Sequence, residues 1–155
     1  MVLKYKISLP GIKGFARVYE VKDNTSLYHF HKQMRADMDF PQDQMILFKA
    51  VDPFGAAVAR YSVVDLGCGT IDEVTLGQLH EAGQDSFVYF YDTTNKKSVL
   101  MDFVEETLLD KTVVYPVLVE TKGPNPIEFE NGYVAFEDRP VEKRRLPDDD
   151  DDEDF

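Results

Sequence analysis

The sequence has one cysteine, no tryptophan and no long apolar run. A single thiol, Cys68, cannot form an internal disulfide, which indicates a reducing compartment and excludes a disulfide-bonded secreted domain. No apolar stretch approaches the roughly 20 residues that a membrane-spanning helix needs. Residues 1–7 alternate apolar side chains with lysines and lack the continuous apolar segment of a signal peptide. We therefore expect a cytoplasmic protein that makes no membrane contact.

Motifs that mark common catalytic and cofactor sites are also missing. The sequence contains no P-loop, no G-x-G-x-x-G and no G-x-S-x-G pattern. The histidines and the cysteine show no zinc-ligand spacing. Asp and Glu are abundant, yet no pair of them is marked out as an acid and a base. These absences predict no cofactor and no metal, and they favour a protein that is not an enzyme.

Clustered basic residues are scarce, since only Lys143, Arg144 and Arg145 stand together. Seven acidic residues follow this triplet within ten positions and largely cancel its charge. Sequence-independent binding to nucleic acid needs clustered Lys and Arg side chains that displace counterions. We therefore expect no direct binding to nucleic acid.

Acidic charge is concentrated near the end of the sequence. The net charge is −12, and residues 148–154 hold seven of the 29 acidic residues and no basic ones. The remaining 22 acidic and 17 basic residues give a net charge of only −5. The seven acidic residues are Asp148, Asp149, Asp150, Asp151, Asp152, Glu153 and Asp154. We predict a disordered acidic tail over residues 141–155, because nothing in it offsets the entropy lost on ordering.

Apolar periodicity predicts the secondary structure. Residues 4–9 alternate apolar and polar side chains, and residues 4–22 are typical of a hairpin. Leu27, Phe30, Met34 and Met38 are spaced by three or four residues, which indicates one face of a helix over residues 25–39. Thr75 and Gln78 have capping-box spacing for a short helix that Gly83 closes. Further strands are expected at residues 45–51, 57–64, 86–91, 98–104 and 111–120.

These segments predict an α+β fold in one domain. The expected order is strand, strand, helix, strand, strand, short helix, strand, strand, strand, with the main helix packed on one face. So little helix between strands favours a mostly antiparallel sheet. The domain is expected to span residues 1–140, with residues 123–140 as an extended Pro-rich arm. Strand order within the sheet and the oligomeric state are left open.

The cysteine and the histidines are the first candidates for chemistry. Cys68 lies between glycines, and the expectation is a bystander loop thiol, since no base is placed beside it. His29 and His31 are two residues apart, so on a helix they point in different directions and cannot chelate one ion. His31 lies on the apolar stripe, which favours a histidine packed at the edge of the core over a ligand or a base.

Taken in order, the segments resemble one family, the plasmid pRiA4b ORF-3-like proteins, which are often encoded near mobile elements. The resemblance covers roughly residues 3–130. It rests on residues 3–13, on the helix positions Leu27, Phe30, His31, Ala36, Met38 and Phe40, on Phe48-Lys49 and Thr75-Leu76, and on residues 87–92, 115–117 and 123–126. The resemblance implies a shared framework and assigns no activity.

Departures from that family fall at polar positions. Gln44-Met45-Ile46 stands where the family commonly has His-x-His, and residues 93–97 replace its Phe-Gly-Asp-x-Trp. Its late cysteines align with Leu118 and Asn125. The comparison implies that any chemistry shared by the family is lost here. His31, Tyr91 and Asp92 remain as candidates for a shared site, and Asp92 is equally well explained as an acid in a hairpin turn.

These observations favour a small binding or adaptor module whose acidic tail engages a basic protein surface. The alternative is a hydrolase-like or metal-dependent enzyme with a site near His31, Tyr91 and Asp92. A third hypothesis is that the tail mimics the charge of nucleic acid and competes for a basic surface. A charge run of this kind is also compatible with a solvated chain that has no partner.

Overall fold

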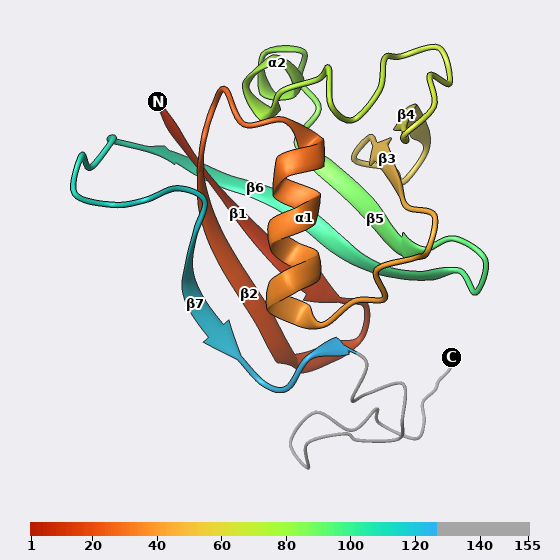
Figure 1. Cartoon of the computed structure of the whole chain (residues 1–155), viewed down its shortest axis with the longest axis horizontal. Coiled ribbons are helices and arrows are strands. Elements are labelled where there is room, and N and C mark those ends of the chain that lie inside the picture. Colours follow the sequence, from red (N-terminus) through yellow and green to blue (C-terminus); the bar gives the residue numbers. More distant parts are fainter. Residues whose placement is uncertain (127–155) are drawn as a thin grey trace.

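A computed structural model of the chain describes residues 1–126, and it contains a seven-stranded sheet and two helices in that part (Figure 1). The arm expected at residues 123–140 lies outside the described residues from residue 127 onward, and so does the acidic tail. The elements are β1 (Val2–Leu9), β2 (Ile12–Lys22), α1 (Leu27–Met38), β3 (Leu47–Val51), β4 (Ala57–Tyr61), α2 (Leu76–Glu81), β5 (Ser86–Asp92), β6 (Lys97–Thr107) and β7 (Val117–Lys122). None of the helices in residues 1–126 is both long and apolar enough to cross a membrane.

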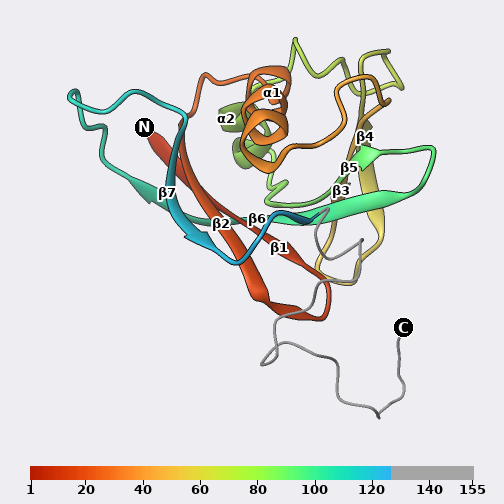
Figure 2. The ribbon, with the colours of Figure 1, turned by 60° about the horizontal axis from the view of Figure 1, so that its bottom comes forward.

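Every strand pair in the sheet is antiparallel, which confirms the predicted pairing. The strands lie in the order β4-β3-β5-β6-β1-β2-β7. The hairpins β1–β2, β3–β4 and β5–β6 are adjacent in this order, while β1 also pairs with β6 and joins the two halves of the chain. Figure 2 shows both helices on the same side of the curved sheet, so one face is covered and the other is not covered by a helix.

Several predicted strands differ in their bounds from the observed ones, β4 and β7 among them. The segment predicted at residues 111–120 forms a strand only from Val117 onward, because Pro116 has no N–H to donate to the ladder. β7 is an edge strand of the sheet. β4 ends at Tyr61 and not near residue 64. Ser62 instead forms an isolated bridge with Thr70, and its hydroxyl donates to the Ile46 carbonyl at 3.0 Å.

Helix α1 attaches to the sheet through its apolar stripe. The side chains buried on this face are Leu27, Phe30, His31, Met34 and Met38. The Phe30 ring lies edge-on to Tyr19, with centroids 5.2 Å apart, and tilted against Tyr5 at 6.0 Å. Burial of each large apolar side chain contributes about 1.5–3 kcal/mol, so this contact holds the helix in place. The helix starts at the N-cap Ser26 and ends at Asp39, within two residues of the predicted bounds.

The loop before α2 caps the first turn of α1. The amide of Leu27 donates to the Val74 carbonyl at 3.0 Å, and the amide of Tyr28 donates to the Ile71 carbonyl at 2.9 Å. The amide of His29 donates to the Ser26 hydroxyl at 3.1 Å. Amides in the first turn of a helix have no carbonyl partner within the helix. The loop supplies acceptors for those of Leu27 and Tyr28, and the Ser26 side chain supplies one for that of His29. The loop at residues 70–75 is therefore fixed against α1.

A buried arginine holds the end of the described chain. Arg17 on β2 is only 3% exposed, and its guanidinium donates to the carbonyls of Lys122 at 2.7 Å and Gly123 at 3.0 Å. It also donates to the Asn125 side chain at 2.9 Å and lies over the Phe15 ring. Burial lowers the pKa of this guanidinium, and hydrogen bonds to carbonyl oxygens compensate for its lost hydration.

Helix α2 begins with the predicted capping box, which is confirmed by the reciprocal bonds of Thr75 and Gln78. Gly77 in its first turn packs directly on the backbone that precedes α1, and its amide donates to the Asp23 carbonyl at 2.8 Å. A β-carbon at position 77 would lie 2.7 Å from that carbonyl oxygen, which is backbone and cannot rotate away.

We expect Gly77→Ala to destabilise the protein by roughly 1–3 kcal/mol, although alanine in a helix is ordinarily favoured over glycine by about 1 kcal/mol. The steric conflict with Asp23 outweighs helix propensity here. Urea unfolding measures the effect, and Glu81→Ala, at an exposed position of the same helix, is the control. Equal or greater stability of the Gly77 variant would contradict the close approach.

Candidate functional site

His31 is hydrogen-bonded to a tyrosine of the sheet. Its Nδ1 lies 2.6 Å from the hydroxyl of Tyr89 on β5. The His31 side chain is 4% exposed and Tyr89 is fully buried. The pKa of His31 is lowered to about 4, mainly by burial and to a smaller extent by the nearby Arg35 and Lys32 cations. His31 is therefore neutral near pH 7, and it supplies the partner that the buried Tyr89 hydroxyl requires.

Tyr91 belongs to the same aromatic cluster as His31, while Asp92 does not. The Tyr91 ring is stacked on Phe40 with centroids 3.8 Å apart, and Phe40 in turn contacts Tyr89 at 6.0 Å. Asp92 accepts hydrogen bonds from the backbone amide of Asn95 at 3.2 Å and from the Asn95 side chain at 2.8 Å. These bonds hold its pKa below the ordinary value. Asp92 thus shapes the β5–β6 turn, and a binding role for the three residues stays a prediction.

Sequence reasoning missed the residues that connect these positions. Tyr89 alternates with Phe87 and Tyr91 along β5, which places the three on one face. That alternation signals a buried face, but it does not reveal that position 89 lies opposite His31. Phe48 on β3 is stacked on Tyr89 at 4.5 Å and completes the cluster. These contacts join residues that are far apart in the sequence, so the spacing of residues along the chain does not reveal them.

A second histidine site, also missed, lies at the end of α2. His80 Nδ1 is 2.6 Å from an Asp85 carboxylate oxygen, and Nε2 is 3.2 Å from a Glu106 carboxylate oxygen on β6. Its ring lies over Phe103, with centroids 4.2 Å apart. The hydrogen bond to Asp85 is the main cause that raises the pKa of His80, and Glu106 adds to it. The five-residue spacing of His80 and Asp85 is visible in the sequence, but Glu106 is brought there by β6.

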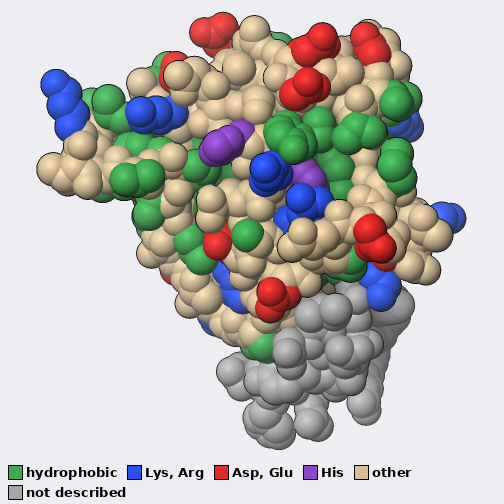
Figure 3. Space-filling view, in the orientation of Figure 1, with side chains coloured by type: hydrophobic (Ala, Val, Ile, Leu, Met, Phe, Trp, Pro, Cys, Tyr) green, Lys and Arg blue, Asp and Glu red, His purple; other side chains and the backbone are tan. Residues whose placement is uncertain are grey.

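An apolar pocket opens between α1 and the loop that follows β4. Its volume is about 390 Å³, and its lining residues are Tyr28, Val63, Ile71 and Asp72. Hydrophobic side chains gather there beside Lys and Arg side chains in Figure 3. The Tyr28 ring contacts His31 at 6.3 Å, so the pocket lies next to the predicted residue.

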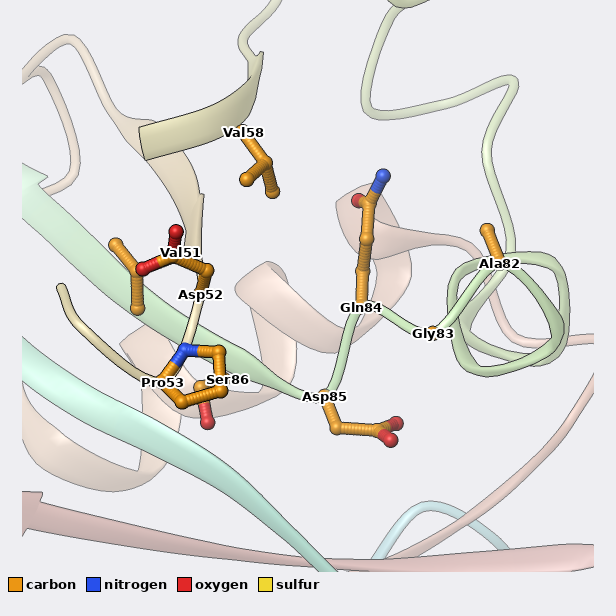
Figure 4. Close-up of a pocket in the computed structure, with 9 residues that line it drawn as sticks. All are labelled: Val51, Asp52, Pro53, Val58, Ala82, Gly83, Gln84, Asp85 and Ser86. Atoms are coloured by element: carbon orange, nitrogen blue, oxygen red, sulfur yellow. The ribbon is translucent and has the colours of Figure 1, made fainter. Parts of the chain in front are cut away.

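A larger cavity of about 530 Å³ lies between the β3–β4 turn and the segment that joins α2 to β5 (Figure 4). Its lining residues are Val51, Asp52, Pro53, Val58, Ala82, Gly83, Gln84, Asp85 and Ser86. Asp85 also bonds to His80, so the histidine network borders this cavity. No group of His, Cys, Asp or Glu side chains within residues 1–126 is arranged to hold a metal ion. Cys68 is an exposed free thiol.

The geometry defines a sheet domain whose buried His31 is hydrogen-bonded to Tyr89 and whose pockets lie where loops leave the sheet. The model of the family described as plasmid pRiA4b ORF-3-like protein matches residues 1–155, so the chain belongs to this family. A solved structure, the crystal structure of the protein of unknown function MM3350 from Methanosarcina mazei Go1, is similar with a TM-score of 0.66. The two are 20% identical, and the match covers 77% of this chain and 68% of that one, which shows a common fold. No curated protein matches the chain.

We expect His31 to reduce stability as the pH falls. Its folded pKa of about 4 lies below the ordinary 6.5, so the unfolded state takes up a proton first and stability is lost between these values. The full effect is about 3 kcal/mol. Urea unfolding across this range tests it. The double variant His31→Leu, Tyr89→Phe removes both hydrogen-bonding groups and is expected to flatten the pH dependence. His29→Gln is the control and should leave it unchanged.

The contribution of His80 to stability is expected to have the opposite pH dependence and to decrease as the pH rises. Its folded pKa is raised, so its ion pairs stabilise the fold fully below the unfolded pKa and lose that effect as the pH rises through the folded pKa. The melting temperature of His80→Gln should fall below that of the unaltered chain at about pH 6 and approach it at about pH 9. A difference that is independent of pH would mean that His80 contributes by packing on Phe103 alone.

Proposed function

We propose that the chain is a cytoplasmic binding module for a basic protein surface, without a catalytic centre of its own. The observation that carries the proposal is the exposed apolar surface around the α1 pocket. Val63, Val64 and Leu66 are each about half exposed, at 51%, 55% and 50%. Val63 lines this pocket, and Val64 and Leu66 follow it in the same loop. Exposed apolar side chains beside a pocket are typical of interaction sites.

The charge of the same loop favours a basic partner. Residues 62–74 include Asp65, Asp72 and Glu73 and no Lys or Arg. Two cations of α1 already have partners, since Lys32 lies over the Tyr28 ring at 5.4 Å and Arg35 donates to the Gln42 carbonyl at 3.1 Å. An apolar surface with acidic neighbours fits a partner that offers apolar side chains within a basic patch.

The acidic tail is proposed to strengthen this attraction. Residues 1–126 hold 17 acidic and 13 basic residues, a net charge of −4, so most of the −12 comes from the remaining 29 residues. Charges on residues 148–154 would act over about one Debye length, roughly 8–10 Å near physiological salt. Their contribution is to the rate of encounter and to a salt-dependent affinity.

Binding is favoured over catalysis because the candidate residues have structural partners. His31 is neutral near pH 7, since its pKa is about 4, and its Nδ1 is bonded to Tyr89, so it is a poor general base. Asp92 is bonded within its own turn. The cytoplasmic location is part of the same proposal and rests on the single, exposed Cys68.

Affinity capture with the full chain as bait tests the proposal. We expect a basic protein to be captured at about 50 mM salt and to be lost at about 300 mM. Replacing all acidic residues at 148–154 with Asn or Gln should weaken this capture about tenfold, because the long-range attraction disappears. The double variant Val63→Ser, Leu66→Ser should weaken capture at both salt concentrations.

The matched control is the double variant Val104→Ser, Val114→Ser, which changes two exposed valines at other places on the surface. It should leave capture intact. If neutralising the tail leaves every captured partner in place, the tail has no part in binding. If the Val63 and Leu66 variant also retains them, the proposed surface is wrong.

A further inference from the structure

We infer that the cavity between the β3–β4 turn and the α2–β5 segment receives a Lys or Arg side chain of the basic partner. This inference rests on the proposed function and gives its partner a specific point of contact. The cavity shares no lining residue with the α1 pocket, whose lining comes from α1 and from the loop after β4. Its volume of about 530 Å³ falls within the roughly 300–1,000 Å³ that is typical of ligand pockets.

One wall of the cavity suits an aliphatic stem. Val51 ends β3, Pro53 lies in the following turn and Val58 projects from β4 (Figure 4). Val58 is 55% exposed, so burial of its methyl groups against a methylene chain removes apolar surface from water. Lys and Arg side chains bury their methylene stems on such surfaces while the charged group stays in contact with water or polar partners.

The charged groups of the cavity are of one sign. Its nine lining residues include two carboxylates, Asp52 and Asp85, and no Lys, Arg or His. Figure 4 shows Asp52 on the side of the turn and Asp85 across the cavity from it, where the chain enters β5, with their carboxylate groups pointing away from one another. An anionic ligand would meet repulsion from both carboxylates and no counter-charge, so the lining selects a cation.

Each carboxylate keeps an oxygen available for a ligand. Asp52 uses Oδ1 to accept the amides of Phe54 and Ala56, both at 2.9 Å, and these bonds fix its position. Asp85 uses Oδ1 to bond His80 at 2.6 Å. Oδ2 of either residue has no hydrogen-bond partner among residues 1–126. A charge-assisted bond from an ammonium or guanidinium group to such an oxygen is stronger than a neutral one.

The neighbouring histidine does not cancel the negative charge. When His80 is protonated, it lies between the carboxylates of Asp85 and Glu106, and these three groups still carry one negative charge. Asp52 adds a second. The opposite wall is also held in place, because the Tyr61 hydroxyl donates to the Gln84 side chain at 2.7 Å. The site is thus preformed, and little ordering of side chains opposes binding.

Titration of the full chain with n-butylammonium, followed by amide NMR shifts, tests the inference. This probe carries the stem and charge of a lysine side chain. We expect saturable shifts at residues 51–53, 58 and 82–86, with n-butanol and butyrate producing at most a tenth of the effect. Absent shifts, shifts centred elsewhere, or an equal response to n-butanol would overturn the inference.

Variants show whether the two carboxylates carry the selectivity. Asp52→Asn keeps an oxygen that accepts the turn amides, so the fold is retained while the charge is lost, and the dissociation constant should rise at least threefold. Val58→Lys, at an exposed position, places a cation in the cavity and should abolish binding of the probe. Asp102→Asn, an exposed carboxylate on β6, is the control and should leave binding unchanged. Equal binding by all three variants would overturn the inference.

Failure here is distinguishable from failure of the proposed function. If n-butylammonium does not bind and the chain still captures a basic protein in a salt-dependent way, only the cavity inference is wrong. If n-butylammonium binds as expected but no basic protein is captured, the cavity inference is supported as a cation site and the proposed function is wrong.

Discussion

The structure depends on the burial of one face of α1 against the sheet. Phe30 packs between Tyr19 and Tyr5, and Met34 and Met38 extend the contact along the helix. A sheet whose apolar face is exposed to water is unstable, so another layer must cover that face. Helix α1 supplies most of this second layer. The single polar group on the buried stripe, His31, is accommodated because Tyr89 lies within hydrogen-bonding distance. The helix thereby accepts only one position over the strands.

That one position also determines where exposed features arise. The loop at residues 70–75 must satisfy the first amides of α1, which places Ile71 and its neighbours beside Tyr28 and forms the apolar pocket. Helix α2 follows directly and carries His80 over Phe103, next to Asp85. The larger cavity lies just beyond, where the chain enters β5. The two pockets therefore lie on connections that the sheet and α1 hold in place.

Local patterns predicted the framework well, because each depends on neighbouring residues. The spacing of Leu27, Phe30, Met34 and Met38 defined α1, and the Thr75–Gln78 pair defined the start of α2. Prediction was weaker at one strand start and at the candidate site. Residues 111–116 are rich in β-branched side chains, yet the strand begins only after Pro116. Among the candidate site residues, the sequence offered His31, Tyr91 and Asp92, but it could not show that Tyr89 and Phe40 link the first two while Asp92 bonds to Asn95.

The sequence by itself determined the α+β class, the antiparallel pairing, the caps and the uneven charge, since composition and periodicity express these properties over short ranges. Only the tertiary structure decided which side chains meet. The pairing of β1 with β6 brings Phe103 and Glu106 toward His80, and the position of α1 brings His31 to Tyr89. Such contacts arise from the balance of packing across many residues, so no single segment encodes them. The same balance left Val63, Val64 and Leu66 outside the core, where the proposed partner binds.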